Sequence, residues 1–388
     1  MRRRGRRFAV GLLVVLTLTS ACSGKGPPAD EPSSTVGYRL VPSCPAPVAP
    51  DRPATAKLVN RVVAATDLAG WQAADIGASV KLADGRLVWV FGDTVRSSAL
   101  QPRIVANSML VSSNRCVSQL TTSDDGPIIP DVSSTQVRWP MSVAPLDHAG
   151  KVPAGTEVLV VLCARTQRGT GGTMDFQFRG TSAAIFTVER GGVPTLVDVY
   201  EVTPDNGAED QVNWGAAAMV HGPWFYVYGS RLTGQAGVFG HALYAARAPQ
   251  SNPRDRSKWQ FWDGGRWQSD RGRASPVISA EEGVSQTLSV NYTRGKFVVV
   301  SKRGGDLGDF VYTWVSSQPT GPFAPHQALK APAGFDTGEY QYAPLAHPEI
   351  PTAPGHLLVS VSRNTSDLTR LLNDPEVGRP VFAEVSLP

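Results

Sequence analysis

The feature that most constrains the fold is a strand pattern that recurs five times along the chain. Each unit begins with a strand of small residues and continues, after a turn, into a strongly apolar strand. The units begin near Asp75, Trp139, Trp214, Val284 and Tyr342, roughly 60 to 75 residues apart. No long stretch shows the 3.6-residue periodicity of an amphipathic helix. Radial repetition of such a unit predicts an all-β fold, a five-bladed β-propeller, which protects its sheet edges by closing into a ring.

The last unit shows three strand patterns, at residues 340–346, 356–362 and 381–386. A fourth strand for this unit is available from the N-terminal segment 38–42. We therefore expect an N-terminal strand to pair with the last blade and so close the ring. A sandwich with a jelly roll is also an all-β fold, but it would not explain the recurrence.

The first unit brings two acids together. Asp75 and Asp93 lie at matching ends of two apolar arms joined by an Asp-Gly turn at 83–85, a strong hairpin signal. In antiparallel arms the start of one strand lies beside the end of the other, so both carboxylates should emerge at one sheet edge. A pair of carboxylates is what glycoside hydrolysis requires. The alternative is that each Asp caps a turn, although Gly77 and Gly92 allow close backbone approach around both acids.

The other units also begin with acids and aromatic residues. In a propeller, ligands usually bind where the innermost strands begin, at one mouth of the channel. The acids at these positions are Glu209, Asp210, Glu281, Glu282, Asp336 and Glu339. The aromatic residues are Trp71, Trp139, Trp214, Tyr340 and Tyr342. Carboxylates combined with aromatic faces suit sugar rings, whereas packing inside a blade is the alternative for each Trp.

The first 22 residues have the pattern of a secretion signal, with five arginines before an apolar core at 8–18 that is too short to span a bilayer. Thr19-Ser20-Ala21-Cys22 resembles a lipobox, which predicts lipidation of Cys22 and a lipid-anchored protein at the outer face of the cytoplasmic membrane. An ordinary signal peptide cut near Ala21 is the alternative. Residues 23–36 are predicted to be a disordered tether, and residues 37–388 the propeller.

Charge and cysteine content exclude some classes of protein. The formal net charge is +4, and five positive charges lie in the predicted signal, so a nucleic-acid partner is not expected. With Cys22 lipidated, Cys44, Cys116 and Cys163 remain, which predicts one disulfide and one free thiol. Cys163 lies in an apolar run and is the expected free thiol, with Cys44 and Cys116 as the preferred pair. No Cys or His spacing suggests a zinc site.

The five-unit layout resembles the five-bladed furanosidase propellers, the arabinanase and invertase-like glycosidases. In those families an Asp of the first unit is base or nucleophile, a middle Asp tunes the pKa, and a later Glu is the acid. The resemblance implies these roles for Asp75, Asp210 and Glu282, with Asp93 as the partner of Asp75.

More closely, Asp75-Ile76-Gly77 with the sequence WVFGDT at 89–94 is similar to an actinobacterial secreted family first catalogued as a domain of unknown function. His347-Pro348 and the stretch 379–382 fit the same group. That family includes endo-D-arabinanases that cut the D-arabinan of mycobacterial-type cell walls. In this chain no Asp begins the second unit, and Asn213 stands where a carboxylate might be expected.

The sequence therefore predicts a monomeric glycoside hydrolase of the cell surface that acts on a furanosidic wall polysaccharide without a cofactor. The predicted substrate-binding residues are Trp71, Trp139, Asn213, Trp214, Tyr342 and His347. A lipid-anchored propeller that binds a wall glycan or a protein without catalysis is the alternative. A calcium ion held by the channel acids is a third possibility.

Overall fold

The computed structural model describes residues 36–44, 53–113, 116–146, 152–171, 175–281 and 283–387. The predicted signal, the lipidation site Cys22 and nearly all of the predicted tether lie outside these residues. Gly37–Pro388 forms one compact unit. Within the described ranges, no helix has the length and apolar character needed to cross a membrane.

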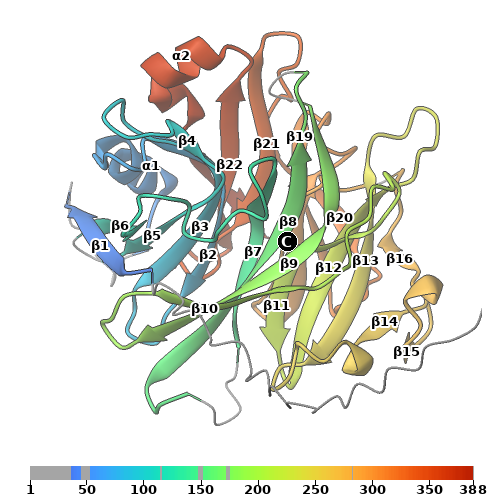
Figure 1. The fold of residues 1–388 in the computed structure, drawn as a ribbon. Coiled ribbons are helices and arrows are strands. Elements are labelled where there is room, and N and C mark those ends of the chain that lie inside the picture. Colours follow the sequence, from blue (N-terminus) through green and yellow to red (C-terminus); the bar gives the residue numbers. More distant parts are fainter. Residues whose placement is uncertain are drawn as a thin grey trace, which may run out of the picture. The chain divides into compact units, whose positions relative to one another are not determined.

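Five antiparallel sheets follow one another along this unit (Figure 1). Their innermost strands are β2 (Ala73–Lys81), β7 (Gln136–Leu146), β11 (Asn213–His221), β17 (Ser289–Thr293) and β21 (Glu339–Ala346). Each of these strands contacts the next, and β21 contacts β2, so that the ring closes. The prediction of an all-β, five-bladed propeller is confirmed.

The remaining strands build each blade outward from its inner strand. Blade 1 adds β3 (Leu87–Val95), β4 (Ile104–Val105), β5 (Ser108–Ser112), β6 (Val117–Thr122) and β1 (Tyr38–Ser43). Blade 2 adds β8 (Thr156–Arg168), β9 (Phe176–Glu189) and β10 (Thr195–Glu201). Blade 3 adds β12 (Trp224–Leu232), β13 (His241–Pro249), β14 (Gln260–Trp262), β15 (Trp267–Gln268) and β16 (Pro276–Ile278). Blade 4 adds β18 (Lys296–Lys302), β19 (Phe310–Ser316) and β20 (Ala324–Lys330), and blade 5 adds β22 (His356–Thr365) and β23 (Val381–Ser386).

The core lies between neighbouring blades, and this explains the apolar runs. Val88 and Val90 of β3 pack in one cluster with Leu159, Val161 and Phe186 of blade 2. A middle strand packs against a neighbouring blade on each face, so most of its residues are buried. Strand β8 accordingly shows a continuous apolar run rather than alternation.

The N-terminal strand does not close the last blade, contrary to the sequence prediction. Strand β1 pairs antiparallel with β6, with Leu40 opposite Leu120, and is therefore the outermost strand of blade 1. A disulfide between Cys44, directly after β1, and Cys116, directly before β6, holds this pairing. The predicted cysteine pair is thus confirmed, and Cys163 is a buried free thiol, as predicted.

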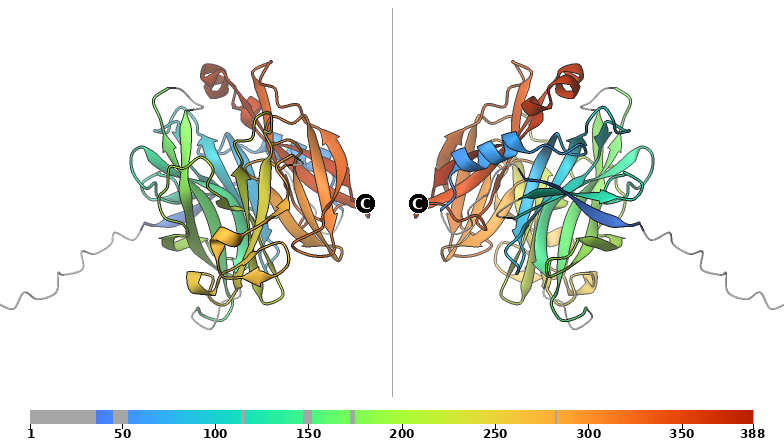
Figure 2. Two further views of the ribbon diagram at one scale, coloured as in Figure 1. Left: turned by 90° about the vertical axis from the view of Figure 1, so that its right-hand side faces the viewer. Right: turned by 90° about the vertical axis from the view of Figure 1, so that its left-hand side faces the viewer.

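Helix α1 (Ala56–Ala65), which the sequence patterns did not predict, covers the outer edge of blade 5 instead. The Asn60 amide donates to the carbonyl of Phe382 and its oxygen accepts from the N–H of Phe382, both at 2.8 Å. One side chain thereby satisfies edge groups of β23 that a fourth strand would otherwise pair. Figure 2 shows blue α1 beside the red C-terminal strands. Two short helical segments, α2 (Leu368–Asn373) and η3 (Pro375–Gly378), lie between β22 and β23, and η1 (Arg256–Lys258) and η2 (Arg271–Arg273) belong to blade 3.

Four of the five inner strands are irregular near their first residues. The strand register shifts between Ala74 and Ala78 in β2, between Pro140 and Ser142 in β7, between Trp214 and Ala217 in β11, and between Tyr342 and Leu345 in β21. A bulge bends its strand and re-aims the side chains around it. These register shifts lie at the end of the inner strands that carries Asp75, Trp139 and Tyr342.

Candidate active site

A cavity of about 300 Å³ opens where the inner strands begin. Residues of blades 1, 2, 4 and 5 line it, and among the described residues three carboxylates do so: Asp75, Asp93 and Asp306. The lining also includes Trp139 and Tyr342, two of the predicted substrate-binding residues. The cavity therefore brings together both acids of the opening hairpin.

The backbone around Asp75 is strained. Ile76 has a φ of 69°, which is an outlier for a β-branched residue, and Gly77 follows with a φ of 79°. The N–H of Ile76 donates to Ser362 Oγ of blade 5 at 2.9 Å, which anchors the distorted strand. A Cβ at Gly92 would collide with Asp75 Oδ1, so glycine is required there for the carboxylate to occupy its position. Strain that the surrounding structure maintains in this way is typical of functional sites.

The surroundings of Asp75 raise the pKa of its carboxyl to near neutral pH. Burial raises the pKa of this carboxyl from 3.8 to about 7, and the charge of Asp93 adds to the effect. Tyr342 opposes the shift because its hydroxyl donates to Asp75 Oδ2 at 2.8 Å. Asn364 in turn donates to the Tyr342 hydroxyl at 3.4 Å. Tyr342 therefore positions Asp75 in this structure.

Asp93 is held by two donors from blade 2. Its Oδ1 accepts from Trp139 Nε1 at 2.8 Å and from Arg168 Nη2 at 2.6 Å. Burial raises the pKa of Asp93, whereas the charge of Arg168 and these two hydrogen bonds act against the rise. Oδ2 has no hydrogen-bond partner among the described residues. Two neighbouring carboxyl groups thus have different surroundings, the arrangement that separates an acid from a nucleophile or base.

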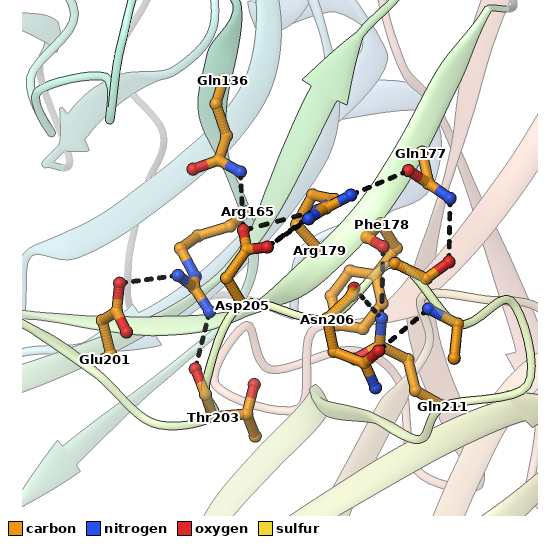
Figure 3. Close-up of polar contacts among 12 residues, drawn as sticks. Gln136, Arg165, Gln177, Phe178, Arg179, Glu201, Thr203, Asp205, Asn206 and Gln211 are labelled. Carbon is orange, nitrogen blue, oxygen red and sulfur yellow. Dashed lines mark hydrogen bonds and ion pairs between the residues drawn. The ribbon is translucent and has the colours of Figure 1, made fainter. Parts of the chain in front are cut away.

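Blade 2 forms one wall of the cavity. Trp139 lies edge-on to Phe176, with ring centroids 5.1 Å apart, and Phe176 is 39% exposed. The backbone that carries Phe176 is braced by the polar network drawn in Figure 3. Gln177 in this network donates to the carbonyl of Gly207 at 2.9 Å, and Gln211 donates to the carbonyl of Phe178 at 3.2 Å.

Buried Arg165 holds the segment that leads to Asp205. Its guanidinium donates to Glu201 and to the carbonyl of Thr203, each at 2.6 Å. Nearby, Arg179 forms an ion pair with Asp205 and donates to Gln177 at 3.2 Å. These contacts hold the start of β9, next to Phe176, and so support the Trp139–Phe176 pair beside Asp93.

Blade 5 supplies a second aromatic surface. Phe335 and Tyr340 lie with ring centroids 5.0 Å apart, and both line the cavity. Phe335 is 52% exposed. Exposed aromatic faces on two sides of half-buried carboxylates suit sugar rings, whose C–H faces pack on aromatic rings.

Several predicted site residues lie away from the cavity lining. Asp210 is mostly exposed and forms an ion pair with Arg231 at 3.1 Å. Trp71 and Trp214 are each 1% exposed and pack on Phe91 and Phe261 inside apolar clusters. The predictions for these three residues are wrong. Asp210 lies in the loop before β11 and is directed to solvent, and the two indoles are directed into the blades.

The remaining predicted residues have other outcomes. His347 is fully buried at the opposite end of the inner strands, where it bonds Ser79 and Ser360, so its assignment to a binding site is also wrong. Asn213 is 3% exposed, outside the cavity lining, and neither polar atom of its side chain has a hydrogen-bond partner in the described part of the chain. Glu282 lies outside the described residues. No group of His, Cys, Asp and Glu with an arrangement that could hold a metal ion occurs among the described residues.

Sequence reasoning missed Asp306, Arg168, Phe176 and Phe335. Arg168 lies 75 residues after Asp93, and only the pairing of blades 1 and 2 brings them together. A local signal existed for Asp306 alone, because the run Gly304-Gly305-Asp306-Leu307-Gly308 indicates a tight turn that presents an acid.

The fold and the site define a five-bladed propeller with a carboxylate-containing cavity at one mouth of its channel. The family described as "Domain of unknown function (DUF5005)" matches residues 64–386, and the chain belongs to this family. No curated protein matches the sequence.

Among solved structures, the chain is similar to a protein of Bacteroides ovatus ATCC 8483 described as a candidate hydrolase, with 16% identity and a TM-score of 0.61 over 90% of this chain and 93% of that one. At this identity the likeness shows the fold alone. A glycoside hydrolase family 43 arabinoxylan arabinofuranohydrolase from Bacillus subtilis has 14% identity and a TM-score of 0.49 over 83% and 64% of the two chains. The alpha-L-arabinofuranosidase domain of Coprinopsis cinerea has 10% identity and a TM-score of 0.45 over 90% and 96%. Likenesses at these two TM-scores say nothing about the activity of this chain.

Proposed function

We propose that this protein is a glycoside hydrolase that cleaves a furanosidic cell-wall glycan of the D-arabinan type. The observation that carries the proposal is the pair Asp75 and Asp93, which share a cavity on adjacent strands but have different surroundings. Asp75 has a pKa of about 7 and can both donate and accept a proton near neutral pH. Asp93 is paired with a guanidinium, which favours its charged form.

The two acids can divide the reaction between them. Asp75 donates its proton to the glycosidic oxygen as the C–O bond breaks, and Oδ2 of Asp93 attacks the anomeric carbon to form a glycosyl ester. A water molecule then attacks the same carbon, releases Asp93 and returns a proton to Asp75. In this scheme Asp93 is the nucleophile and Asp75 the acid and base, whereas the family resemblance favoured Asp75 as nucleophile or base. Asp210 has no part because it lies outside the cavity lining.

The two aromatic surfaces support a polymeric substrate. Trp139 and Phe176 of blade 2 and Phe335 and Tyr340 of blade 5 lie on different sides of the acids and can each pack against a sugar ring. A chain bound on both surfaces would be cut internally.

The cellular setting is also part of the proposal. The N-terminal pattern supports export, lipidation at Cys22 and a place at the outer face of the cytoplasmic membrane, with the tether leading to a monomeric propeller. Replacement of Cys22 by Ser should move the protein from the membrane fraction to the medium. Retention of this variant in the membrane would contradict lipid anchoring at Cys22.

The central test is incubation of residues 37–388 with purified arabinogalactan. We expect the parent protein to release arabinose oligosaccharides and the Asp75→Asn and Asp93→Asn variants to release none. Binding of the glycan without release by the parent would identify a non-catalytic glycan-binding propeller instead. Neither binding nor release would contradict the proposed substrate.

A further inference from the structure

Asp306 is a third carboxylate of the cavity, besides Asp75 and Asp93, and it has no role in the proposed reaction. It lies in the loop between β18 and β19 of blade 4 and lines the same cavity as Asp75 and Asp93. In a ring of five blades, blade 4 does not adjoin blade 1, so this carboxylate enters the cavity from across the channel. Gln286 and Thr287, also of blade 4, line the cavity beside it.

The loop that carries Asp306 is tightly constrained. Gly304 and Gly305 have φ values of 83° and 79°, which favour glycine. A Cβ on Gly305 would collide with the carbonyl oxygen of Phe239, and one on Gly308 would collide with that of Arg303. The N–H of Gly304 donates to the carbonyl of Gly283 at 2.9 Å, which fastens the loop to the segment before β17. The position of Asp306 is therefore set by the backbone.

Only one of the two carboxylate oxygens of Asp306 accepts a hydrogen bond from the described residues. Oδ2 accepts the N–H of Gln286 at 3.2 Å, whereas Oδ1 has no hydrogen-bond partner among the described residues. A fixed carboxylate with an available oxygen is a strong acceptor for a hydroxyl group, because hydrogen bonds to charged groups are stronger than those between neutral groups.

Lys302 provides the counter-charge for this acid. Its side chain is fully buried, and its ammonium group donates to the carbonyl of Gln341, a blade 5 residue that also lines the cavity. Burial lowers the pKa of Lys302 to about 8, and the charges of Asp306 and Asp309 act against that change. His241 also lies near Asp306, whose charge opposes the lowering of the histidine pKa by burial.

We propose that Asp306 is the hydroxyl-recognition residue of the site and selects an unsubstituted sugar next to the cleaved bond. Gln286 and Thr287 complete a polar wall opposite the hairpin acids. A glycan whose hydroxyl at this place carries an acyl group or a branch leaves the carboxylate oxygen without a donor and is rejected. The inference rests on the proposed function, since it names the part of the substrate that the same cavity recognises.

The test separates binding from chemistry. In the inactive Asp75→Asn background, we measure binding of arabinan oligosaccharides by calorimetry, with and without Asp306→Asn. We expect the dissociation constant to rise about 10- to 100-fold, the range for loss of a hydrogen bond to a charged group. In the active protein, Asp306→Asn should raise KM by a similar factor and change kcat little, and Asp306→Glu should restore part of the affinity.

The matched control is Asp309→Asn. Asp309 is exposed, lies three residues further along the same loop, is absent from the cavity lining and accepts the N–H of Ala333. This variant should bind like the parent.

Equal binding by the Asp306→Asn and parent proteins would overturn the inference but leave the proposed function intact. A fall in kcat without a change in binding would also overturn it, because Asp306 would then act in the chemistry. If the Asp75→Asn protein binds no arabinan and the active protein releases none, the proposed function itself fails.

Discussion

Strands β2 and β21 join blades 1 and 5 at both of their ends, but one end is a buried structural contact and the other is the cavity. At the far end, buried His347 follows β21 and bonds Ser79 of β2 at 2.5 Å and Ser360 at 2.8 Å. Its ring packs on Trp89 and Phe382, and both ring nitrogens have partners. At the cavity end, Asp75 and Tyr342 also join the two blades, but on a strained backbone and beside an open cavity.

This difference shows how a structural contact can be distinguished from a functional one. A satisfied network around a fully buried side chain stabilises the ring, whereas strain and a carboxyl with a raised pKa lower stability and are retained where chemistry needs them. Four predictions test this interpretation.

The largest effect is expected at the cavity end. Asp75→Asn should lower kcat by about 10²- to 10⁴-fold, the range attributed to a general acid or base. It should also raise the melting temperature at pH 8. Because the pKa of Asp75 is raised on folding, from 3.8 to about 7, folding disfavours its charged form, and stability falls as the pH rises across that interval. Kinetics together with thermal unfolding at pH 8 check both parts, and a less stable variant would contradict the interpretation that the charge of Asp75 lowers stability.

Replacement of His347 should lower the stability of the protein and leave its activity unchanged. His347→Ala removes two hydrogen bonds, leaves Ser360 Oγ without its partner and opens a space beside Trp89, at a cost of about 2–4 kcal/mol. Ser79 keeps its hydrogen bond to Glu349. The kcat of the folded fraction should stay at the parent value. Denaturant unfolding measures the cost, and exposed His326→Ala serves as the control. Lost activity in folded protein would indicate that the far end also serves the reaction.

A smaller loss is expected for Gly92→Ala. The added Cβ would displace the Asp75 carboxylate without removing it, and a shift of about 1 Å in a catalytic group can cost roughly 10²-fold in rate. We expect kcat/KM to fall about 10- to 100-fold. Gly37→Ala, where a Cβ would lie 3.8 Å from Ser123, is the control in the same blade. Parent activity in the Gly92 variant would show that the exact position of Asp75 matters little.

Tyr342→Phe should give the smallest change. The Tyr342 hydroxyl stabilises the ionised form of Asp75, so its loss should raise the pKa of that carboxyl further. The limb of the pH–rate profile governed by Asp75 should move to higher pH by up to about one unit, equivalent to roughly 1.4 kcal/mol. An unmoved profile with a raised KM would mean that Tyr342 contacts substrate, as the sequence first suggested.

The propeller itself could be predicted from the sequence because its information is local. Alternation of small, apolar and turn residues is repeated in each blade, and the Asp-Gly turn sets the register that places Asp75 and Asp93 at one edge. The pairing of Cys44 with Cys116 was also correctly preferred. Strand β20 and helix α1 were missed, since five of the seven residues of β20 are exposed and α1 depends on the edge of β23 that it covers.

The direction of side chains was decided by tertiary structure alone. Trp139 and Trp214 occupy similar places in their units, yet the first bonds Asp93 in the cavity and the second is buried in the core. A bulge near each of these residues bends the strand and re-aims the side chains around it. The contacts of Asp75 with Tyr342 and of Asp93 with Arg168 likewise join residues 267 and 75 positions apart. By itself the sequence determined the blades and the acid pair. Packing of neighbouring blades and closure of the ring determined which residues surround that pair, because only tertiary structure brings distant strands into contact.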